Sequence, residues 1–72
     1  MVSIEGAIDY YKQGLKITPT SEKLLYNIAC SYEKIGKFAN ALRWFKHVLD
    51  SNPGSVDAHY GLSLASFKVK NY

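Results

Sequence analysis

The sequence predicts an all-α protein, a right-handed α-solenoid made of antiparallel helical hairpins. In the middle of the chain Leu25, Ile28 and Tyr32 recur with the 3.6-residue period of one helix face, and a second such pattern follows. Pro19 and Pro53 stand 34 positions apart, a period typical of arrays in which each repeat is one helical hairpin. The helices are expected at about residues 4–17, 22–35, 38–51 and 56–69.

Residues that cap or interrupt helices mark the predicted boundaries. Ser21 and Ser55 precede the second and fourth helices, where a serine hydroxyl can accept a hydrogen bond from the first turn. Gly36 follows the second helix, at a position that favours the left-handed conformation. Pro19 and Pro53 end the first and third helices, because the residue before a proline is pushed out of the α region.

The outer two helices repeat the pattern of the inner two. A shift of 34 residues places the first helix on the third and the second on the fourth. The matching pairs are Ala7 with Ala41, Ile8 with Leu42, Tyr11 with Phe45, Leu15 with Leu49, Tyr26 with Tyr60 and Ile28 with Leu62. The chain thus contains half a repeat, one full repeat at residues 22–55 and another half. We expect residues 1–72 to form a single repeat segment that belongs to a longer array.

The full repeat resembles the tetratricopeptide repeat family. The residues that carry the resemblance are Leu25, Ile28, Ala29, Tyr32, Ala41, Phe45 and Pro53. Ala29 and Ala41 are expected where the two helices cross most closely, since small side chains let the backbones approach. Val48, His59 and Ser66 depart from the family pattern. The nearest alternative, the 35-residue pentatricopeptide repeat, fits the spacing of the prolines less well.

The resemblance implies a concave groove, lined by the first helix of each repeat, that holds a peptide or a partner helix. The residues outside the core stripes of the second and fourth helices form this predicted peptide-binding groove. They are Lys23, Tyr26, Asn27, Cys30, Lys34, Asp57, Tyr60, Gly61, Leu64, Phe67 and Lys68. Glu33 lies on the same helix face. Tyr26 and Tyr60 are expected to be neighbours that offer flat amphipathic rings to a partner; the alternative is that they pack against adjoining repeats.

Some members of the family hold the terminal carboxylate of chaperone peptides with lysine, asparagine and arginine side chains. Asn27 stands at the asparagine position, but the next repeat presents Asp57 and Gly61 in place of cations. Because Asp57 would repel a carboxylate, this binding mode is disfavoured. We expect a protein–protein interaction scaffold with an unidentified protein or peptide partner. Two alternatives stay open: a purely structural segment of a larger scaffold, and an RNA-contacting helical repeat.

The fourth helix has apolar residues on more than one side, and its pattern lacks a hairpin partner. Leu62, Ala65 and Val69 form a predicted self-association edge that one neighbouring helix cannot cover. A second copy of the chain could supply the missing helix, so a homodimer is the corresponding expectation.

Composition and charge disfavour several other classes of protein. Of the 72 residues, 47% are hydrophobic, and nine Lys and Arg against six Asp and Glu give a net charge of +3. The cations are spread along the chain, so nucleic-acid binding is disfavoured. No apolar stretch is long enough to cross a bilayer. The single cysteine, Cys30, suits a reducing compartment, and a cytoplasmic location is expected.

Few residues of the sequence are candidates for catalysis or metal binding. His47 and His59 have no paired carboxylate at helical spacing, and Cys30 has no Cys or His partner at metal-ligand spacing. The sequence therefore predicts no catalytic site, no metal site and no cofactor, and we expect that the protein is not an enzyme.

Overall fold

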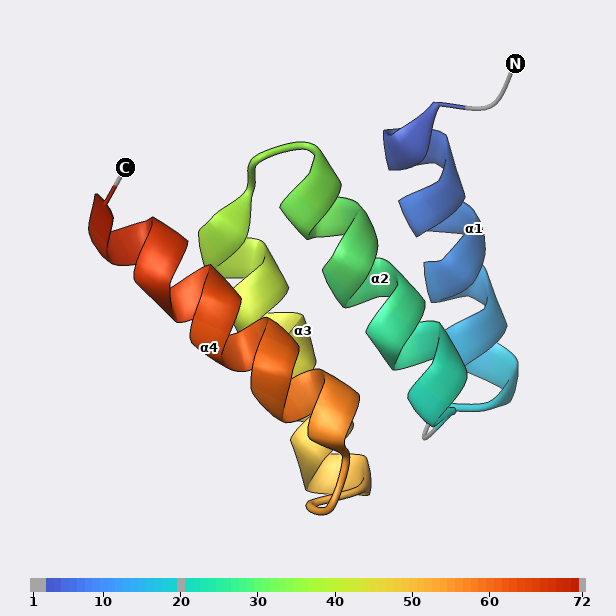
Figure 1. The fold of residues 1–72 in the computed structure, drawn as a ribbon. Coiled ribbons are helices and arrows are strands. Elements are labelled where there is room, and N and C mark those ends of the chain that lie inside the picture. The colour runs from blue at the N-terminus through green and yellow to red at the C-terminus, as the bar shows by residue number, and fades with distance from the viewer. Residues whose placement is uncertain (1–2, 20, 72) are drawn as a thin grey trace.

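Four α-helices lie side by side, and each runs antiparallel to the one before it (Figure 1). The computed structural model describes residues 3–19 and 21–71, and these contain no strand. The helices are α1 (Ile4–Ile17), α2 (Glu22–Lys34), α3 (Phe38–Ser51) and α4 (Val56–Asn71). Each helix packs against its neighbours in the chain, and α4 also touches α2. The predicted all-α architecture with four helices is confirmed.

The helix ends follow the caps that the sequence suggests, with two small differences. The Oγ of Ser21 accepts the Leu24 N–H at 3.4 Å, and Gly36 has a φ of 81° directly after α2. Helix α2 ends at Lys34, one residue earlier than predicted, because Ile35 already has non-helical backbone angles. Helix α4 continues two residues further than predicted, to Asn71. No glycine or proline interrupts residues 69–71, and the helix therefore runs on.

The buried core lies where α2, α3 and α4 meet. Ala29 of α2 and Ala41 of α3 are fully buried in one cluster with Phe45 and Ala65. Alanines at these positions let α2 and α3 approach closely, and the Phe45 ring fills the space beside them. The prediction that both alanines lie in the close contact between the two helices therefore agrees with the structure.

One lysine of α1 reaches side chains of both α2 and α3. The Nζ of Lys12 donates a hydrogen bond to the Tyr32 hydroxyl at 2.8 Å. It also lies 5.4 Å from the centre of the Tyr32 ring and 5.6 Å from that of Trp44. The contact with Tyr32 is the hydrogen bond to its hydroxyl, at the edge of the ring, whereas an ammonium near the Trp44 ring gains attraction from the ring quadrupole. Lys12 is therefore a structural residue that joins α1 to α2 and α3.

No helix among the described residues is long and apolar enough to cross a membrane. Within the same residues, no three His, Cys, Asp or Glu side chains come together as metal ligands would. The two histidines contact other groups instead. His47 lies against Trp44, with ring centres 5.3 Å apart, and the Nε2 of His59 lies 2.9 Å from the Pro53 carbonyl oxygen.

Candidate protein-binding groove

Phe45 of α3 packs between α2 and α4. Its side chain is only 1% exposed. On the α2 side, the Tyr26 ring meets it edge-on, with ring centres 5.8 Å apart. On the α4 side, the backbone of Gly61 comes so close that a Cβ there would lie 2.5 Å from two ring carbons of Phe45. Phe45 therefore lies beneath the candidate groove, which is the surface of α2 and α4 on either side of it; both helices stand in front of α3 in Figure 1.

Most of the predicted groove residues are accessible on the surfaces of α2 and α4. On α2, Lys23 and Lys34 are exposed, while Tyr26, Asn27 and Cys30 are half-buried. On α4, Leu64 is half-buried, Asp57 is exposed, and Tyr60 and Phe67 are 71% and 64% exposed. The two tyrosines thus differ in their surroundings. Tyr26 packs against Phe45, whereas the Tyr60 ring extends into solvent.

Three predicted surface residues lie elsewhere. Gly61 is buried under the Phe45 ring, so it is part of the helix contact and not of the groove surface. Ala65 is fully buried in the same core, so its prediction as a residue of the exposed self-association edge is wrong. The Nζ of Lys68 lies over the Phe38 ring, 4.9 Å from its centre, and so the ammonium is held at the start of α3.

The sequence of α4 contains a pattern of small residues from which the burial of Gly61 and Ala65 could have been predicted. Ala58, Gly61 and Ala65 recur at helical spacing, and all three are buried. A stripe of small side chains favours close contact with a large ring on the neighbouring helix. The repeat pattern assigns Gly61 to the groove by position alone and does not take into account the size of Phe45.

A hollow of about 240 Å³ lies at one end of the groove, where α2 and α4 begin. It is lined by Glu22, Lys23, Tyr26, Ser55 and Asp57. Ser55 is buried, and its Oγ accepts the Ala58 N–H at 3.2 Å. Glu22 accepts from the Nδ2 of Asn52, at 3.2 Å to each carboxylate oxygen. The sequence analysis indicates Ser55 only as a helix cap and assigns no role to Glu22. The 34-residue shift could have found them, because it places the starts of α2 and α4 at the same end of the stack.

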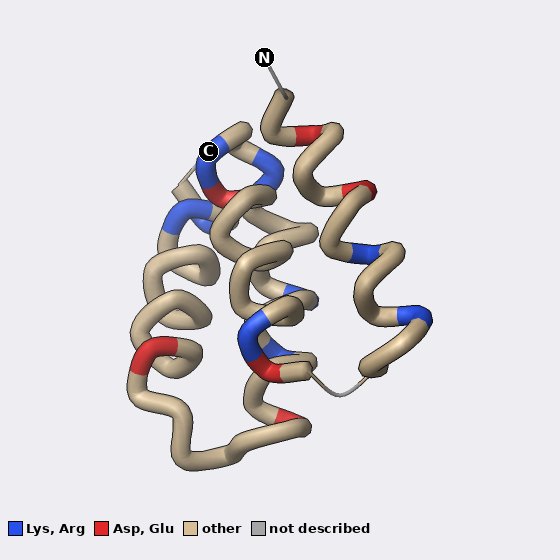
Figure 2. The backbone as a smooth tube through the Cα atoms, turned by 90° about the vertical axis from the view of Figure 1, so that its right-hand side faces the viewer, with Lys and Arg blue, Asp and Glu red and all other residues tan. Residues whose placement is uncertain are grey.

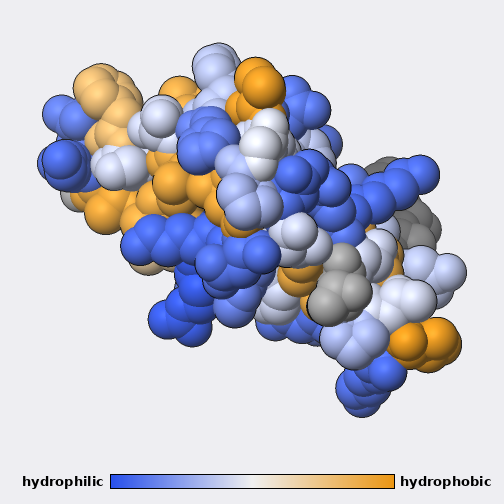
Figure 3. Space-filling model, turned by 90° about the horizontal axis from the view of Figure 1, so that it is seen from below, coloured by the Kyte–Doolittle hydropathy of each residue, from blue (hydrophilic) through white to orange (hydrophobic). Residues whose placement is uncertain are grey.

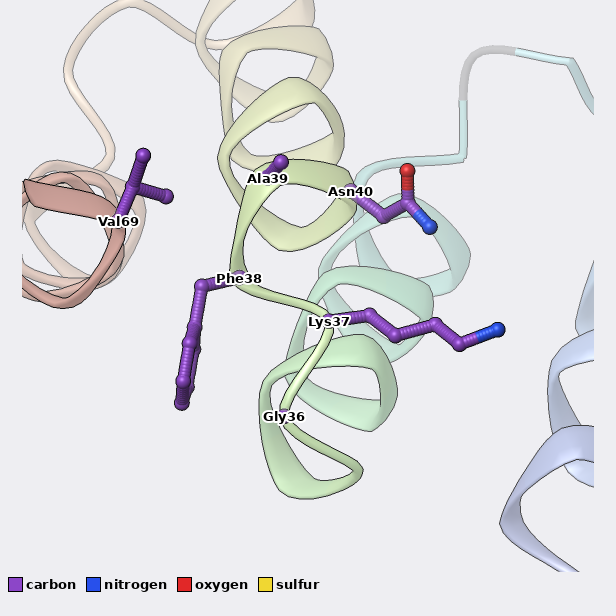
Figure 4. Close-up of a pocket in the computed structure, with 6 residues that line it drawn as sticks. All are labelled: Gly36, Lys37, Phe38, Ala39, Asn40 and Val69. Atoms are coloured by element: carbon purple, nitrogen blue, oxygen red, sulfur yellow. The ribbon is translucent and has the colours of Figure 1, made fainter. Parts of the chain in front are cut away.

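A larger hollow, of about 400 Å³, lies outside the groove, between the first turn of α3 and the end of α4. Phe38, Ala39 and Val69 give it an apolar lining. Figure 4 shows Phe38 and Val69 on the side between the two helices, while the Lys37 side chain extends away. Val69 is exposed and Leu62 is half-buried, so these two members of the predicted edge are accessible.

Residues 22–55 match the family model described as Tetratricopeptide repeat. The match covers α2, the turn at Gly36, α3 and the connection to α4. This segment, within a stack of four helices, fits a tetratricopeptide-like repeat. Such repeats are generally protein–protein interaction modules and are typically non-catalytic. No curated protein matches the chain.

Among the candidate groove residues, Tyr26 and Cys30 have shifted pKa values. A hydrogen bond with Cys30 raises the pKa of Tyr26 to about 12, and burial and the charges of Cys30, Asp57 and Glu33 act in the same direction. Burial raises the pKa of the Cys30 thiol, as do the charges of Glu33 and Asp57, while the bond to Tyr26 and the charge of Lys34 oppose this. Both groups are therefore held in their neutral, protonated forms at pH 7.

The Tyr26 hydroxyl makes the stability of the fold depend on alkaline pH. An unfolded tyrosine has a pKa of about 10, so between pH 10 and about 12 the folded state binds more protons than the unfolded state. The free energy of unfolding therefore falls as the pH rises through this range. We expect urea midpoints to fall more steeply from pH 10 to 12 in the wild type than in Tyr26→Phe. Equal slopes in the two proteins would contradict the assignment.

Acidic and basic residues are both distributed over the helices. Figure 2 shows positions of both signs spread over the helices; along α1, two acidic positions are followed by two basic ones. Seen from below, the surface is mainly hydrophilic, and its apolar part gathers on the side where α4 lies (Figure 3). A nucleic-acid footprint would instead cluster cations on one face.

Proposed function

We propose that the chain is a protein–protein interaction module that binds a peptide or a partner helix in the groove between α2 and α4. The observation that carries the proposal is the exposed aromatic surface of α4. Tyr60, Leu64 and Phe67 follow one another at helical spacing, and the two aromatic rings are among the most exposed large side chains of the molecule. Large exposed apolar patches on soluble domains mark interaction sites.

The tetratricopeptide architecture supports this assignment. Aromatic rings supply large contact areas with few rotatable bonds, so little entropy is lost when they are fixed by a partner. Phe45 packs between α2 and α4, and Tyr26 and Cys30 are half-buried on α2, with the Tyr26 ring against Phe45. A peptide in this groove would contact both walls at once. If the chain were a purely structural segment of a larger scaffold, the exposed rings of Tyr60 and Phe67 would have no binding role.

Tyr60→Ala tests the groove, and Tyr10→Ala is its matched control. Tyr10 is 73% exposed on α1, nearly the same exposure as Tyr60, but lies outside the groove. A peptide selected from a display library should bind Tyr60→Ala about tenfold more weakly or worse. The Tyr10→Ala variant should bind it as the wild type does. If fluorescence anisotropy gives equal affinities for the two variants, the groove is not the binding surface.

A second candidate function is self-association through the other side of α4. The apolar hollow beside Val69 favours it, since the hollow and the half-buried Leu62 form an uncovered apolar face. The same face would suit the next helix of a longer array. Light scattering of the wild type and of Val69→Asp tests the homodimer. A dimer that dissociates in the variant supports it, and a monomeric wild type contradicts it.

A further inference from the structure

We infer that copies of the chain stack head to tail, so that α1 of one copy packs beside α4 of the next and completes a repeat across the contact. The inference rests on the second candidate function, self-association, and names the helix that covers α4. Because the two contacting surfaces differ, each added copy again presents one free surface of each kind. The contacts between α2 and α3 within one copy are the template for this stack.

Helix α1 is of the kind that α4 lacks. A shift of 34 residues places α1 on α3 and α2 on α4. Helix α2 packs between α1 and α3, whereas α4 packs against α3 and touches α2. The side of α4 that corresponds to the α3 side of α2 is therefore open. The chain carries the matching helix, α1, at the opposite edge of the molecule (Figure 1).

The exposed apolar side chains lie on these two outer helices. Among the described residues, every large hydrophobic side chain that is exposed belongs to α1 or α4. These side chains are Ile4, Tyr10 and Ile17 on α1 and Val56, Tyr60, Phe67 and Val69 on α4. Apolar surface gathered in this way marks a contact with another protein chain. The inner helices α2 and α3 have no such residues because each has a neighbour on both sides.

The close approach between α2 and α3 has its counterpart on the two free faces. Ala29 of α2 and Ala41 of α3 are fully buried in one cluster. The shift places Ser63 on Ala29 and Ala7 on Ala41, yet Ser63 is exposed and Ala7 is only half-buried. Both side chains are small enough to let two helices approach closely. In the stack, Ala7 of one copy would lie against Ser63 of its neighbour.

An aromatic contact has a counterpart as well. The Tyr26 ring meets the Phe45 ring edge-on, with ring centres 5.8 Å apart. The equivalent residues are Tyr60, which is 71% exposed, and Tyr11, which is half-buried. An edge-on pair between these two rings would add attraction beyond the buried area. Tyr26 remains half-buried in its own contact, so Tyr60 in the stack would keep an accessible side for a peptide.

A hollow of about 310 Å³ between α1 and α2 provides space for a third contact. It is lined by Tyr10, Gln13, Gly14, Ile17 and Leu24. The shift places Gly14 on Val48, which shares a buried cluster with Leu25. The residue equivalent to Leu25 is His59, which is exposed on α4. Because Gly14 leaves open the space that the Val48 side chain fills, His59 of a neighbouring copy would lie at this hollow.

The charges at the helix ends agree with the antiparallel pairing. Within one copy the end of α3 lies beside the start of α2, since a side-chain hydrogen bond joins them. In the stack Lys16 at the end of α1 would therefore lie near Asp57 at the start of the neighbouring α4. Glu5 and Lys70 would lie near each other at the opposite end. Opposite charges at exposed positions add little affinity, but they favour this orientation over the reverse.

Disulfide cross-linking tests which helices meet. In a Cys30→Ala background, one protein carries Ala7→Cys and a second carries Ser63→Cys. We expect the oxidised mixture to contain copies that are linked from position 7 to position 63, because the equivalent alanines lie in one buried cluster. Asp9→Cys replaces Ala7→Cys in the control. Its equivalent on α3, Arg43, is exposed, and the control should give no link to position 63.

Light scattering over a range of concentrations measures the assembly itself. The mass of the wild type should rise beyond two copies as the concentration increases. Ser63→Arg should weaken the association about tenfold or more, because a large side chain would stand where the helices cross. Ser63→Ala gives α4 the residue that α2 has at this place and should associate at least as well as the wild type. Ser63 is exposed within one copy, so circular dichroism should show both variants folded.

The possible failures are distinguishable. A wild type that stays monomeric at the highest soluble concentration overturns this inference and the self-association candidate together, and leaves the peptide groove untouched. An assembly that stops at two copies, or that withstands Ser63→Arg, overturns the inference but keeps self-association. The inference is also overturned if position 63 links to position 9 as readily as to position 7, because α1 would then not present its Ala7 face.

Discussion

Replacing Phe45 by alanine is expected to lower the free energy of unfolding by about 3–5 kcal/mol. The ring is 1% exposed, shares a buried cluster with Ala29, Ala41 and Ala65, and fills the space between three helices. The three buried residues that share its cluster are alanines, whose side chains are too short to fill the cavity. A chain of this size has a total stability of roughly 4–11 kcal/mol, and the variant should therefore be close to unfolding at 25 °C. Urea unfolding followed by circular dichroism measures the loss.

Phe67→Ala is the matched control for this experiment. It removes the same atoms from a ring that is 64% exposed on α4, and it should change stability by no more than about 0.5 kcal/mol. If Phe45→Ala unfolds completely, Phe45→Leu gives a measurable intermediate, with an expected loss of about 1–2 kcal/mol. Similar losses for Phe45→Ala and Phe67→Ala would show that the three helices do not meet at Phe45.

Gly61→Ala is expected to destabilise the fold by about 1–2 kcal/mol, although alanine is the better helix former. In an open helix the exchange would stabilise by about 1 kcal/mol. Here the new Cβ would lie 2.5 Å from the Cε1 and Cζ atoms of Phe45, and this ring is enclosed by the core. Overpacking of this kind costs about 1–3 kcal/mol and outweighs the gain in helix propensity.

Gly14→Ala separates the gain in helix propensity from the cost of overpacking. Gly14 is also inside a helix, but its added Cβ would approach Leu24 at the end of a flexible side chain, at 3.0 Å from Cδ1. We expect this variant to be neutral or slightly stabilised. The close approach of α4 to Phe45 would be contradicted by a stabilised Gly61→Ala protein. Thermal unfolding of both variants under the same conditions gives the comparison.

Much of the fold could be predicted from local signals. Ser21, Ser55 and Gly36 act at the helix ends as their chemistry suggests, because caps depend on only a few neighbouring residues. Ala29 and Ala41 are buried in the helix contact because the hairpin pattern places small residues opposite each other. The family resemblance is confirmed for residues 22–55.

The candidate groove could be predicted only in part, because its details depend on packing between distant residues. The repeat pattern gives the side of α4 on which Asp57 and Tyr60 lie, but the depth of Gly61 and Ala65 depends on the size of the Phe45 ring. The bond from Asn52 to Glu22 joins residues that are 30 positions apart, and no local signal indicates it. Which atoms stay without a partner, such as the Oε2 of Glu33, is decided by the assembled structure alone.

The meeting of α2, α3 and α4 at Phe45 is tested most directly by an isotope-edited NOESY spectrum of the wild-type protein. We expect strong cross-peaks from the Phe45 ring protons to the Gly61 Hα protons and to the Tyr26 ring. Cross-peaks to Tyr26 without any to Gly61 would mean that α4 does not pack over the ring. The groove between α2 and α4 would then not exist in the form described.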